Sequence, residues 1–220
     1  MSFNDPAGPG EPAAESRTAS DARTLRALAH PVRIALIEKL VLYGAMTATE
    51  AGERIGQSPT TCSFHLRQLA KYGFVEEAGG GKGRARPWRM TTTGLSVTAR
   101  DDPESQIAED ALVRIFRERQ FERYRTWLQT KASYPRRWRD ASDDSAYVFY
   151  LTVEELEQLT TDLTAMLMPL FRERMADPSK RPAGSVPVQV LLLSHPIAHP
   201  AAADAEAGHE AGHKDEETPG

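Results

Sequence analysis

The stretch that decides the fold is residues 47–73, with the sequence TATEAGERIGQSPTTCSFHLRQLAKYG. Thr47 and Glu50 have the spacing of a capping box, in which two side chains satisfy free backbone N–H groups at the start of a helix. The glycine three residues beyond Glu53 is a residue type that commonly ends a helix. Ser58 is a favoured N-cap, and the proline that follows it is tolerated at the first helical position. The stretch therefore predicts two short helices joined by a tight turn.

The segments on either side complete a small domain. Residues 25–43 carry apolar side chains at helical spacing, and Pro31 predicts a break near the start of that helix. After the two short helices, residues 74–78 and 84–91 have the composition of strands on either side of the glycine-rich segment 79–83. Three helices followed by a hairpin predict a winged helix-turn-helix domain over residues 23–97.

The second short helix has one apolar face and one polar face. Leu66 and Leu69 are predicted to face the core together with Cys62, which leaves the polar residues for the outside. A helix of this kind fits the major groove of DNA, where each base pair shows its own pattern of donors and acceptors. The predicted DNA-facing residues are Ser58, Thr60, Thr61, Ser63, Phe64, His65, Arg67, Gln68 and Lys71 on the helix, and Lys82, Arg84 and Arg86 on the hairpin.

These residues divide by chemistry into two groups. The hydroxyls of Thr60, Thr61 and Ser63, together with the Phe64 ring, are predicted to reach base edges, and His65 and Gln68 are further candidates. Basic side chains neutralise phosphates, so Arg67 and Lys71 are predicted to contact the DNA backbone. Lys82, Arg84 and Arg86 on the hairpin are predicted to follow the flanking backbone or the minor groove.

The distribution of charge agrees with this prediction, although the net charge of −4 does not. Residues 54–90 contain seven Lys or Arg and two acids, a local charge of +5. Residues 198–220 contain six acids and one Lys, a local charge of −5. Phosphate affinity depends on the local charge of the docking face, so the basic segment is more informative than the total.

The region from residue 98 to residue 197 carries no comparable motif. A long amphipathic helix is predicted over residues 103–130, and strands are predicted at residues 146–151 and 186–193, with a capped helix between them. The predicted fold class is therefore α+β, mainly helical. Two roles are open for this region: dimerisation, which a long amphipathic helix favours, or a ligand pocket for a small-molecule effector. The pocket would be lined by Trp127, Tyr147, Phe149 and Tyr150.

The remaining features limit the other classes of function. Residues 1–22 and 198–220 are predicted to be disordered, because they have few apolar residues and no periodicity. We expect a cytoplasmic, nucleoid-associated protein without a signal peptide or a membrane span. No nucleophile–base pair or nucleotide-binding loop is present, so we expect neither an enzyme nor a cofactor. The single cysteine cannot form a tetrahedral soft-metal site, and His209 and His213 lie in a segment better interpreted as a solvated tail.

Three segments resemble the ArsR-type winged-helix regulators of bacteria. They are the opening helix LRALAHPVRIALIEKL at residues 25–40, SFHLRQL within the second short helix, and MTTTG at residues 90–94. The resemblance covers roughly residues 24–95. It implies a homodimeric transcriptional regulator, usually a repressor, whose long terminal helices pair. It also points to Ser58, Thr60, Thr61, Ser63, His65 and Arg67 as the DNA-facing set. The chain differs from the metal-sensing members because Cys62 stands alone on its helix.

The function expected from these features is sequence-specific binding to double-stranded DNA at a near-palindromic operator. The alternative is a winged helix that serves as a protein-interaction module and does not read DNA. The basic residues of the hairpin favour the first hypothesis, because a protein-interaction module has no need of them.

Overall fold

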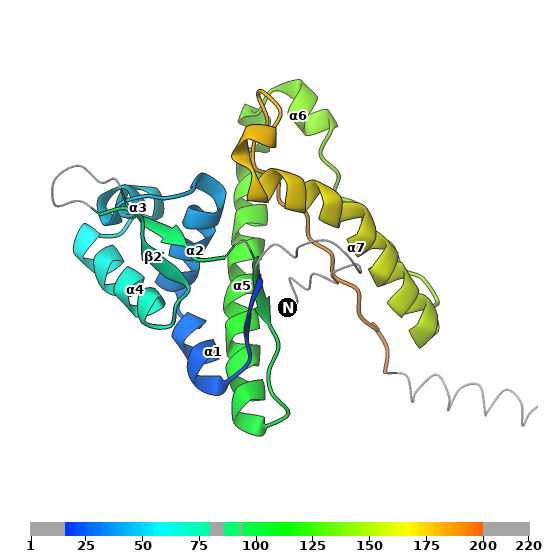
Figure 1. The fold of residues 1–220 in the computed structure, drawn as a ribbon. Helices are drawn as coiled ribbons and strands as arrows, with labels where there is room; N and C mark the ends of the chain where they lie inside the picture. The colour runs from blue at the N-terminus through cyan, green and yellow to red at the C-terminus, as the bar shows by residue number, and fades with distance from the viewer. Residues whose placement is uncertain (1–15, 80–85, 93, 200–220) are drawn as a thin grey trace, which may run out of the picture. The chain divides into compact units, whose positions relative to one another are not determined.

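The computed structural model describes residues 16–79, 86–92 and 94–199. The chain divides into two compact units: residues 1–147 with 165–187, and residues 148–164 with 188–220. Figure 1 shows the order of the elements along the chain. They are β1 (Ser16–Ala19), α1 (Ala22–Leu28), α2 (Pro31–Tyr43), α3 (Ala48–Ile55), α4 (Pro59–Lys71), β2 (Val75–Glu77), β3 (Trp88–Met90), β4 (Gly94–Val97), α5 (Pro103–Thr130), η1 (Lys131–Ser133), α6 (Arg136–Asp140), α7 (Val153–Ala176) and η2 (Pro178–Lys180).

The predicted α+β, mainly helical fold class is confirmed, and so is the winged helix-turn-helix order of the elements. The capping box of α3 is present: Glu50 N–H donates to Thr47 Oγ1 at 3.2 Å, and Thr47 N–H donates to Glu50 Oε2 at 2.7 Å. The helix ends at Gly56, whose φ of +68° lies in the left-handed region. Ser58 caps α4 by accepting from Thr61 N–H at 3.0 Å.

The turn between α3 and α4 is closed by a second glycine. Gly52 is buried, and its carbonyl accepts from the backbone N–H of Gln57 at 3.0 Å. A Cβ atom at this position would lie 2.5 Å from the Gln57 carbonyl oxygen. Such an approach is too short for any side chain, so only glycine allows the two helices to meet at this angle.

The hairpin is joined to the rest of the domain by its own backbone. β2 pairs antiparallel with β3, with Glu76 opposite Arg89 and Glu77 opposite Trp88. Met46 forms an isolated antiparallel bridge to Trp88, with N–H to O distances of 3.0 and 2.8 Å in the two directions. Trp88 and Met46 are both buried. The hairpin of β2 and β3, called the wing below, is therefore fixed to the chain segment that precedes α3.

Residues 16–22 correct the prediction of a disordered N-terminal tail. β1 pairs in parallel with β4, in register from Ser16 opposite Gly94 to Ala19 opposite Val97. Ala19 and Val97 are buried in the core, so the pairing also contributes apolar contacts. The β4 partner of each β1 residue lies 78 positions away in the sequence, and single-sequence periodicity does not detect such a pairing. Residues 1–15 lie outside the described part of the chain, as do residues 200–220.

The core continues from the winged domain into the first half of α5. Ser105, Ala108, Leu112 and Phe116 are buried along one face of this helix, which packs against α1. Glu38 on α2 adds ion pairs to Arg119 at 2.7 Å and to an arginine one turn further along α5 at 3.0 Å. The helix bounds agree with the predicted helix over residues 103–130.

The two strands predicted in the C-terminal region are wrong. Residues 146–151 and 186–193 form no strand in the structure, whereas the helix between them is present as α7. Both segments have the β-branched and aromatic composition of strands, but a strand is defined by its pairing partner as well as by composition. The capping box predicted at the start of α7 is present, with Thr152 N–H donating to Glu155 Oε2 at 2.8 Å.

Candidate nucleic-acid interface

The helix α4 presents one exposed stripe opposite its buried face. Cys62, Leu66 and Leu69 are buried in the core. The exposed residues recur every three or four positions, which places them along one side of the helix. This surface, called the α4 stripe below, consists of Thr60, Phe64, Arg67 and Lys71.

The residues beside the stripe differ in their freedom to contact a ligand. Ser63 and Gln68 are half-buried, and their side chains form no hydrogen bond with another described residue. Ser58 and Thr61 lie 2.8 Å apart, hydroxyl to hydroxyl, at the start of the helix. Ser58 also caps the helix, so the main role of its hydroxyl is structural.

Phe64 is the exposed aromatic residue of the stripe. Its side chain is 55% exposed, although it makes an edge-to-face contact with His65 at a ring separation of 5.1 Å. Large apolar side chains on a helix surface are available for contact with another apolar group. A thymine methyl in the major groove is a suitable partner.

His65 does not belong to the exposed surface, which corrects its prediction as a DNA-facing residue. It is 8% exposed and lies against the ring of His30 at a centroid distance of 4.4 Å. The residue is three positions after Cys62 and four before Leu69, so the helix turns it toward the core. Burial lowers the pKa of His65, and the positive charge of Arg33 acts in the same direction.

Cys62 is a free thiol in the core, as the sequence predicts. Burial raises the pKa of this thiol, which keeps it in the neutral form at physiological pH. The thiolate is the form that binds metals and reacts with oxidants. Among the described residues, no group of three or more His, Cys, Asp or Glu is placed to hold a metal ion.

The wing carries cations that already have acidic partners. Arg86 contacts Glu77 at 2.7 Å, and Arg89 contacts Glu76 at 2.7 Å across the β2–β3 ladder. The hydrogen bond and charge of Glu77 raise the pKa of Arg86. All four side chains are exposed, and exposed ion pairs are weak enough to exchange for other partners. Lys82 and Arg84 lie outside the described residues.

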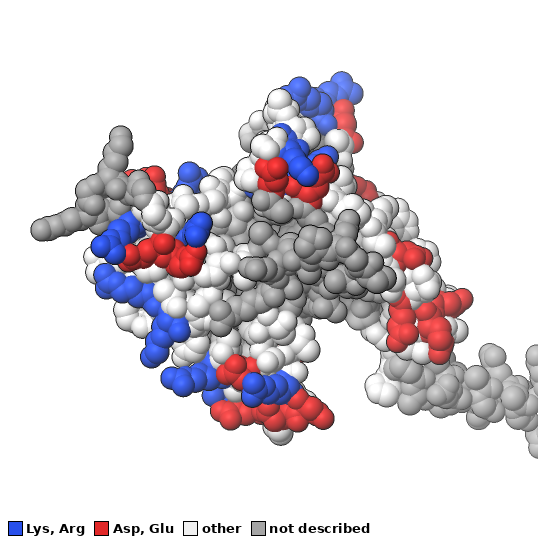
Figure 2. All heavy atoms as spheres, viewed as in Figure 1, with Lys and Arg blue, Asp and Glu red and all other residues white. Residues whose placement is uncertain are grey.

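Basic side chains gather on the surface of the winged domain along α4. Figure 2 shows Lys and Arg along the edge of the molecule formed by α4, with an acidic group next to them. The glutamates of the wing thus pair with its arginines, whereas Arg67 and Lys71 on α4 form no ion pair within the described residues. The local charge of +5 over residues 54–90 counts these cations alike. We therefore expect Arg67 and Lys71 to be more available to DNA phosphates than the paired arginines of the wing.

One contact near the helix-turn-helix was missed by the sequence analysis. The Arg54 guanidinium at the end of α3 lies 4.4 Å from the centre of the Tyr43 ring at the end of α2. Cation–π contacts of this kind hold neighbouring elements together at a partly exposed site. No local signal identifies the pair, because the two residues are brought together by the packing of two helices.

The aromatic residues of the predicted effector pocket are not buried. Trp127 packs edge-on against Tyr134 at a ring separation of 4.8 Å. Tyr147, Phe149 and Tyr150 are exposed by 73%, 63% and 103%. A ligand pocket formed by these residues stays a prediction.

None of the described helices has the length and the apolar character that crossing a bilayer requires.

Comparison with known proteins agrees with the geometry of the first unit. Residues 28–78 match a family model described as a helix-turn-helix domain. This range runs from the end of α1 through the wing strand β2. The chain therefore contains a winged helix-turn-helix domain, a type of domain whose second helix commonly enters the major groove.

Three solved structures align with parts of this chain at low overall similarity. The transcriptional repressor BigR from Xylella fastidiosa is 28% identical, over 44% of this chain and 84% of its own, with a TM-score of 0.29. A MarR family regulator from Neisseria meningitidis is 15% identical, over 63% and 74%, with a TM-score of 0.29. ZitR from Lactococcus lactis is 16% identical, over 64% and 81%, with a TM-score of 0.27. Among curated proteins, none matches the chain significantly.

Proposed function

We propose that this protein is a transcriptional regulator that binds double-stranded DNA with α4 in the major groove. The observation that carries the proposal is the α4 stripe: a capped helix, fixed by its buried face, that presents polar, basic and aromatic side chains on the other. The helix-turn-helix domain matched over residues 28–78 supports the same function. Major-groove width suits a single helix of this kind.

The proposed roles of the side chains follow from their exposure. Thr60, Ser63 and Phe64 would contact base edges, with Gln68 and Thr61 at the margin. Arg67 and Lys71 would contact phosphates, and the N-terminal N–H groups beside Ser58 would donate to a further phosphate oxygen. Lys82, Arg84 and Arg86 would follow the flanking DNA from the wing. His65 supports the helix from within and is no longer proposed to contact a base.

We further propose that the protein acts as a homodimer on a near-palindromic operator, as a repressor of the ArsR type. The face of α5 away from α1 supports this, because Ile107, Phe121 and Leu128 are exposed by 68%, 38% and 40%. A second copy would bury these side chains and place two α4 helices about one helical turn of DNA apart. Sedimentation of the full chain tests the dimer: a monomer at micromolar concentration would contradict it.

The salt dependence of binding distinguishes DNA recognition from the alternative, a protein-interaction module that does not read DNA. Fluorescence anisotropy would compare the chain's own upstream DNA with scrambled DNA of equal length, at several salt concentrations. We expect a preference for the upstream DNA and an affinity that falls steeply as salt rises. Weak and equal binding to both duplexes, and to other genomic fragments in a genome-wide selection, would contradict the proposal.

Variants of the α4 stripe test the mode of binding. Arg67→Ala and Lys71→Ala should weaken binding to all sequences and reduce the salt slope by about 1 each. Thr60→Val and Ser63→Ala should alter the sequence preference, because they change base-edge contacts. Arg137→Ala on α6 removes the same charge from an exposed position outside α4 and outside the proposed dimer face of α5, and it serves as the control. Equal effects of Arg67→Ala and Arg137→Ala would contradict the assignment of α4.

A further inference from the structure

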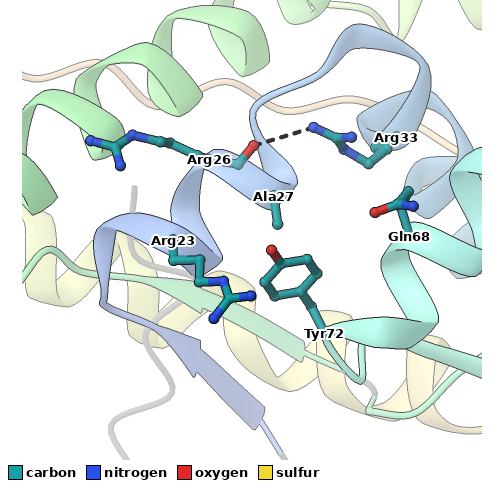
Figure 3. A pocket seen from close by; sticks show the side chains of 6 residues that line it. All are labelled: Arg23, Arg26, Ala27, Arg33, Gln68 and Tyr72. Atoms are coloured by element: carbon teal, nitrogen blue, oxygen red, sulfur yellow. Dashed lines mark hydrogen bonds between the residues drawn. The ribbon is translucent and has the colours of Figure 1, made fainter.

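A cleft of about 280 Å³ lies between α1, α2 and the C-terminal half of α4 (Figure 3). It does not coincide with the α4 stripe. It is lined by Arg23, Arg26, Ala27, Arg33, Gln68 and Tyr72. Three of these six residues are arginines, and none is acidic. A cleft with this lining is a candidate for an anion.

One of the three arginines is neutralised. The Arg26 guanidinium contacts Glu104 of α5 at 2.6 Å, and Figure 3 shows it directed away from the other lining side chains. The residue contributes its carbonyl oxygen instead, which accepts from Arg33 Nη2 at 3.2 Å. Arg23 and Arg33 form no ion pair with a carboxylate in the described part of the chain. The cleft therefore holds two uncompensated positive charges.

Arg33 is the more constrained of the two. Its Nε atom is buried and has no hydrogen-bond partner within the described residues. Burial also lowers the pKa of the guanidinium, which reflects the cost of removing this cation from water. A buried donor without an acceptor is unfavourable, and a charged one more so. An anion in the cleft would offset the cost of the partly buried charge, because it would place the opposite charge beside the Arg33 guanidinium.

The neutral side chains of the cleft come from α4. In Figure 3 the Tyr72 hydroxyl points toward α1. The Gln68 amide, one helical turn earlier in α4, faces the same space. Both groups can donate a hydrogen bond. Groups that can donate thus come from α1, α2 and the C-terminal end of α4. A phosphoryl group has several acceptor oxygens, so it can pair with more than one of these groups.

We propose that the cleft between α1, α2 and α4 binds a phosphoryl group, held by Arg23 and Arg33 with Gln68 and Tyr72. Guanidinium groups form paired, charge-assisted hydrogen bonds with phosphate oxygens. A water molecule occupies about 30 Å³ of liquid, so the cleft has room for a phosphate and for part of the molecule that carries it. The phosphoryl group belongs either to a free small molecule or to the backbone of bound DNA. The site goes beyond the proposed function because binding of a free phosphate requires no DNA.

The first arm of the test uses inorganic phosphate and no DNA. Phosphate is titrated into the full chain at constant ionic strength, with chloride as the reference anion, and binding is followed by the arginine Nε–H resonances and by calorimetry. Arg23→Gln and Arg33→Gln should each weaken binding at least about tenfold, the effect of losing one charge-assisted hydrogen bond. Arg137→Gln, which removes the same charge from the exposed surface of α6 outside the cleft, should leave it unchanged. Cleft-dependent binding assigns the site to a free phosphoryl compound.

The second arm measures DNA affinity for the same variants. If inorganic phosphate does not bind but Arg23→Gln and Arg33→Gln weaken DNA binding more than Arg137→Gln does, the site holds a backbone phosphate. If neither ligand distinguishes the cleft variants from Arg137→Gln, the proposal is overturned. Arg33→Gln carries the risk of misfolding, since Arg33 is half-buried and donates to the Arg26 carbonyl. The exposed Arg23→Gln keeps the test valid, with circular dichroism as the check on folding.

Discussion

The segment from residue 19 to residue 116 and the segment from residue 117 to residue 199 differ sharply in burial. Every buried side chain of the described residues lies in the first segment. In the second, α7 carries Leu156, Leu159, Leu163 and Leu167 at helical spacing, yet each of them is only half-buried. Apolar residues at helical spacing thus lie on helices in both segments, but they are buried in a core only in the first segment, where several elements pack together. The difference teaches that amphipathic sequence predicts an element and does not predict what covers it.

The largest expected effect contrasts one leucine from each segment. Leu66→Ala removes a side chain that is 0% exposed and leaves a cavity between α4 and the core, so it should lower the free energy of unfolding by about 2–5 kcal/mol. Leu159→Ala on α7 should cost less than about 1.5 kcal/mol, because its side chain is only half-buried. Urea unfolding followed by circular dichroism measures both. A similar loss for the two variants would mean that the second segment has a core of its own.

The next effect concerns the ion pairs that join α2 to α5. Glu38→Gln removes the carboxylate that contacts Arg119 at 2.7 Å and Arg123 at 3.0 Å, with the Glu38 side chain 14% exposed. We expect a loss of roughly 1–3 kcal/mol, because two cations lose a partly buried partner. Glu122→Gln removes one member of an exposed pair with Arg125 and should stay within about 0.5 kcal/mol. Thermal unfolding at low and high salt would show whether Glu38 behaves like the exposed control.

The two capping boxes offer a matched comparison of the segments. Thr47→Ala removes the cap of α3 and should destabilise the winged domain by about 1 kcal/mol. Thr152→Ala removes the same motif from α7 and should reduce helix content without a change in the unfolding midpoint of the winged domain. Chemical denaturation is monitored at Trp88 fluorescence, in a chain in which Trp127 and Trp138 are replaced by phenylalanine, and at the helix band of circular dichroism, which separates the two readouts. A shift of the winged-domain midpoint by Thr152→Ala would show that the segments unfold together.

The smallest effect is a dependence on pH in the first segment. Burial lowers the pKa of both His30 and His65 below the ordinary value of 6.5, so the folded state disfavours their protonation. Stability is then complete above about pH 6.5 and declines as the pH falls below it, because the unfolded chain takes up protons first. His30 Nδ1 also accepts from Val32 N–H at the start of α2, and protonation removes this acceptor.

The pH dependence can be assigned with one substitution. His65→Phe should reduce the loss of stability as the pH falls below about 6.5 and leave the part that His30 contributes, whereas changes at more acidic pH should persist. Those belong to caps such as Asp21 and Glu50, whose pKa values are lowered by hydrogen bonds at Thr24 and Thr47. An unchanged slope in His65→Phe would locate the titration in other groups.

The sequence alone was sufficient where a structure depends on neighbouring residues. The capping box at Thr47, the proline break at Pro31, the N-cap at Ser58 and the bounds of the helix at residues 103–130 were all predicted. Each rests on hydrogen bonds or dihedral preferences within a few positions, which the local sequence specifies. The exposed residues of the α4 stripe followed from the same helical spacing.

Only the tertiary structure decided the features that depend on distant partners. His65 was assigned to the DNA-facing surface because it is polar, yet the packing of α4 against His30 buries it. The pairing of β1 with β4 and the cleft lined by Arg23 and Arg33 join elements that the local sequence does not relate. Residues 146–151 and 186–193 have the composition of strands and form none. Local propensity sets what a segment can become, and the free energy of packing with distant elements decides what it does become.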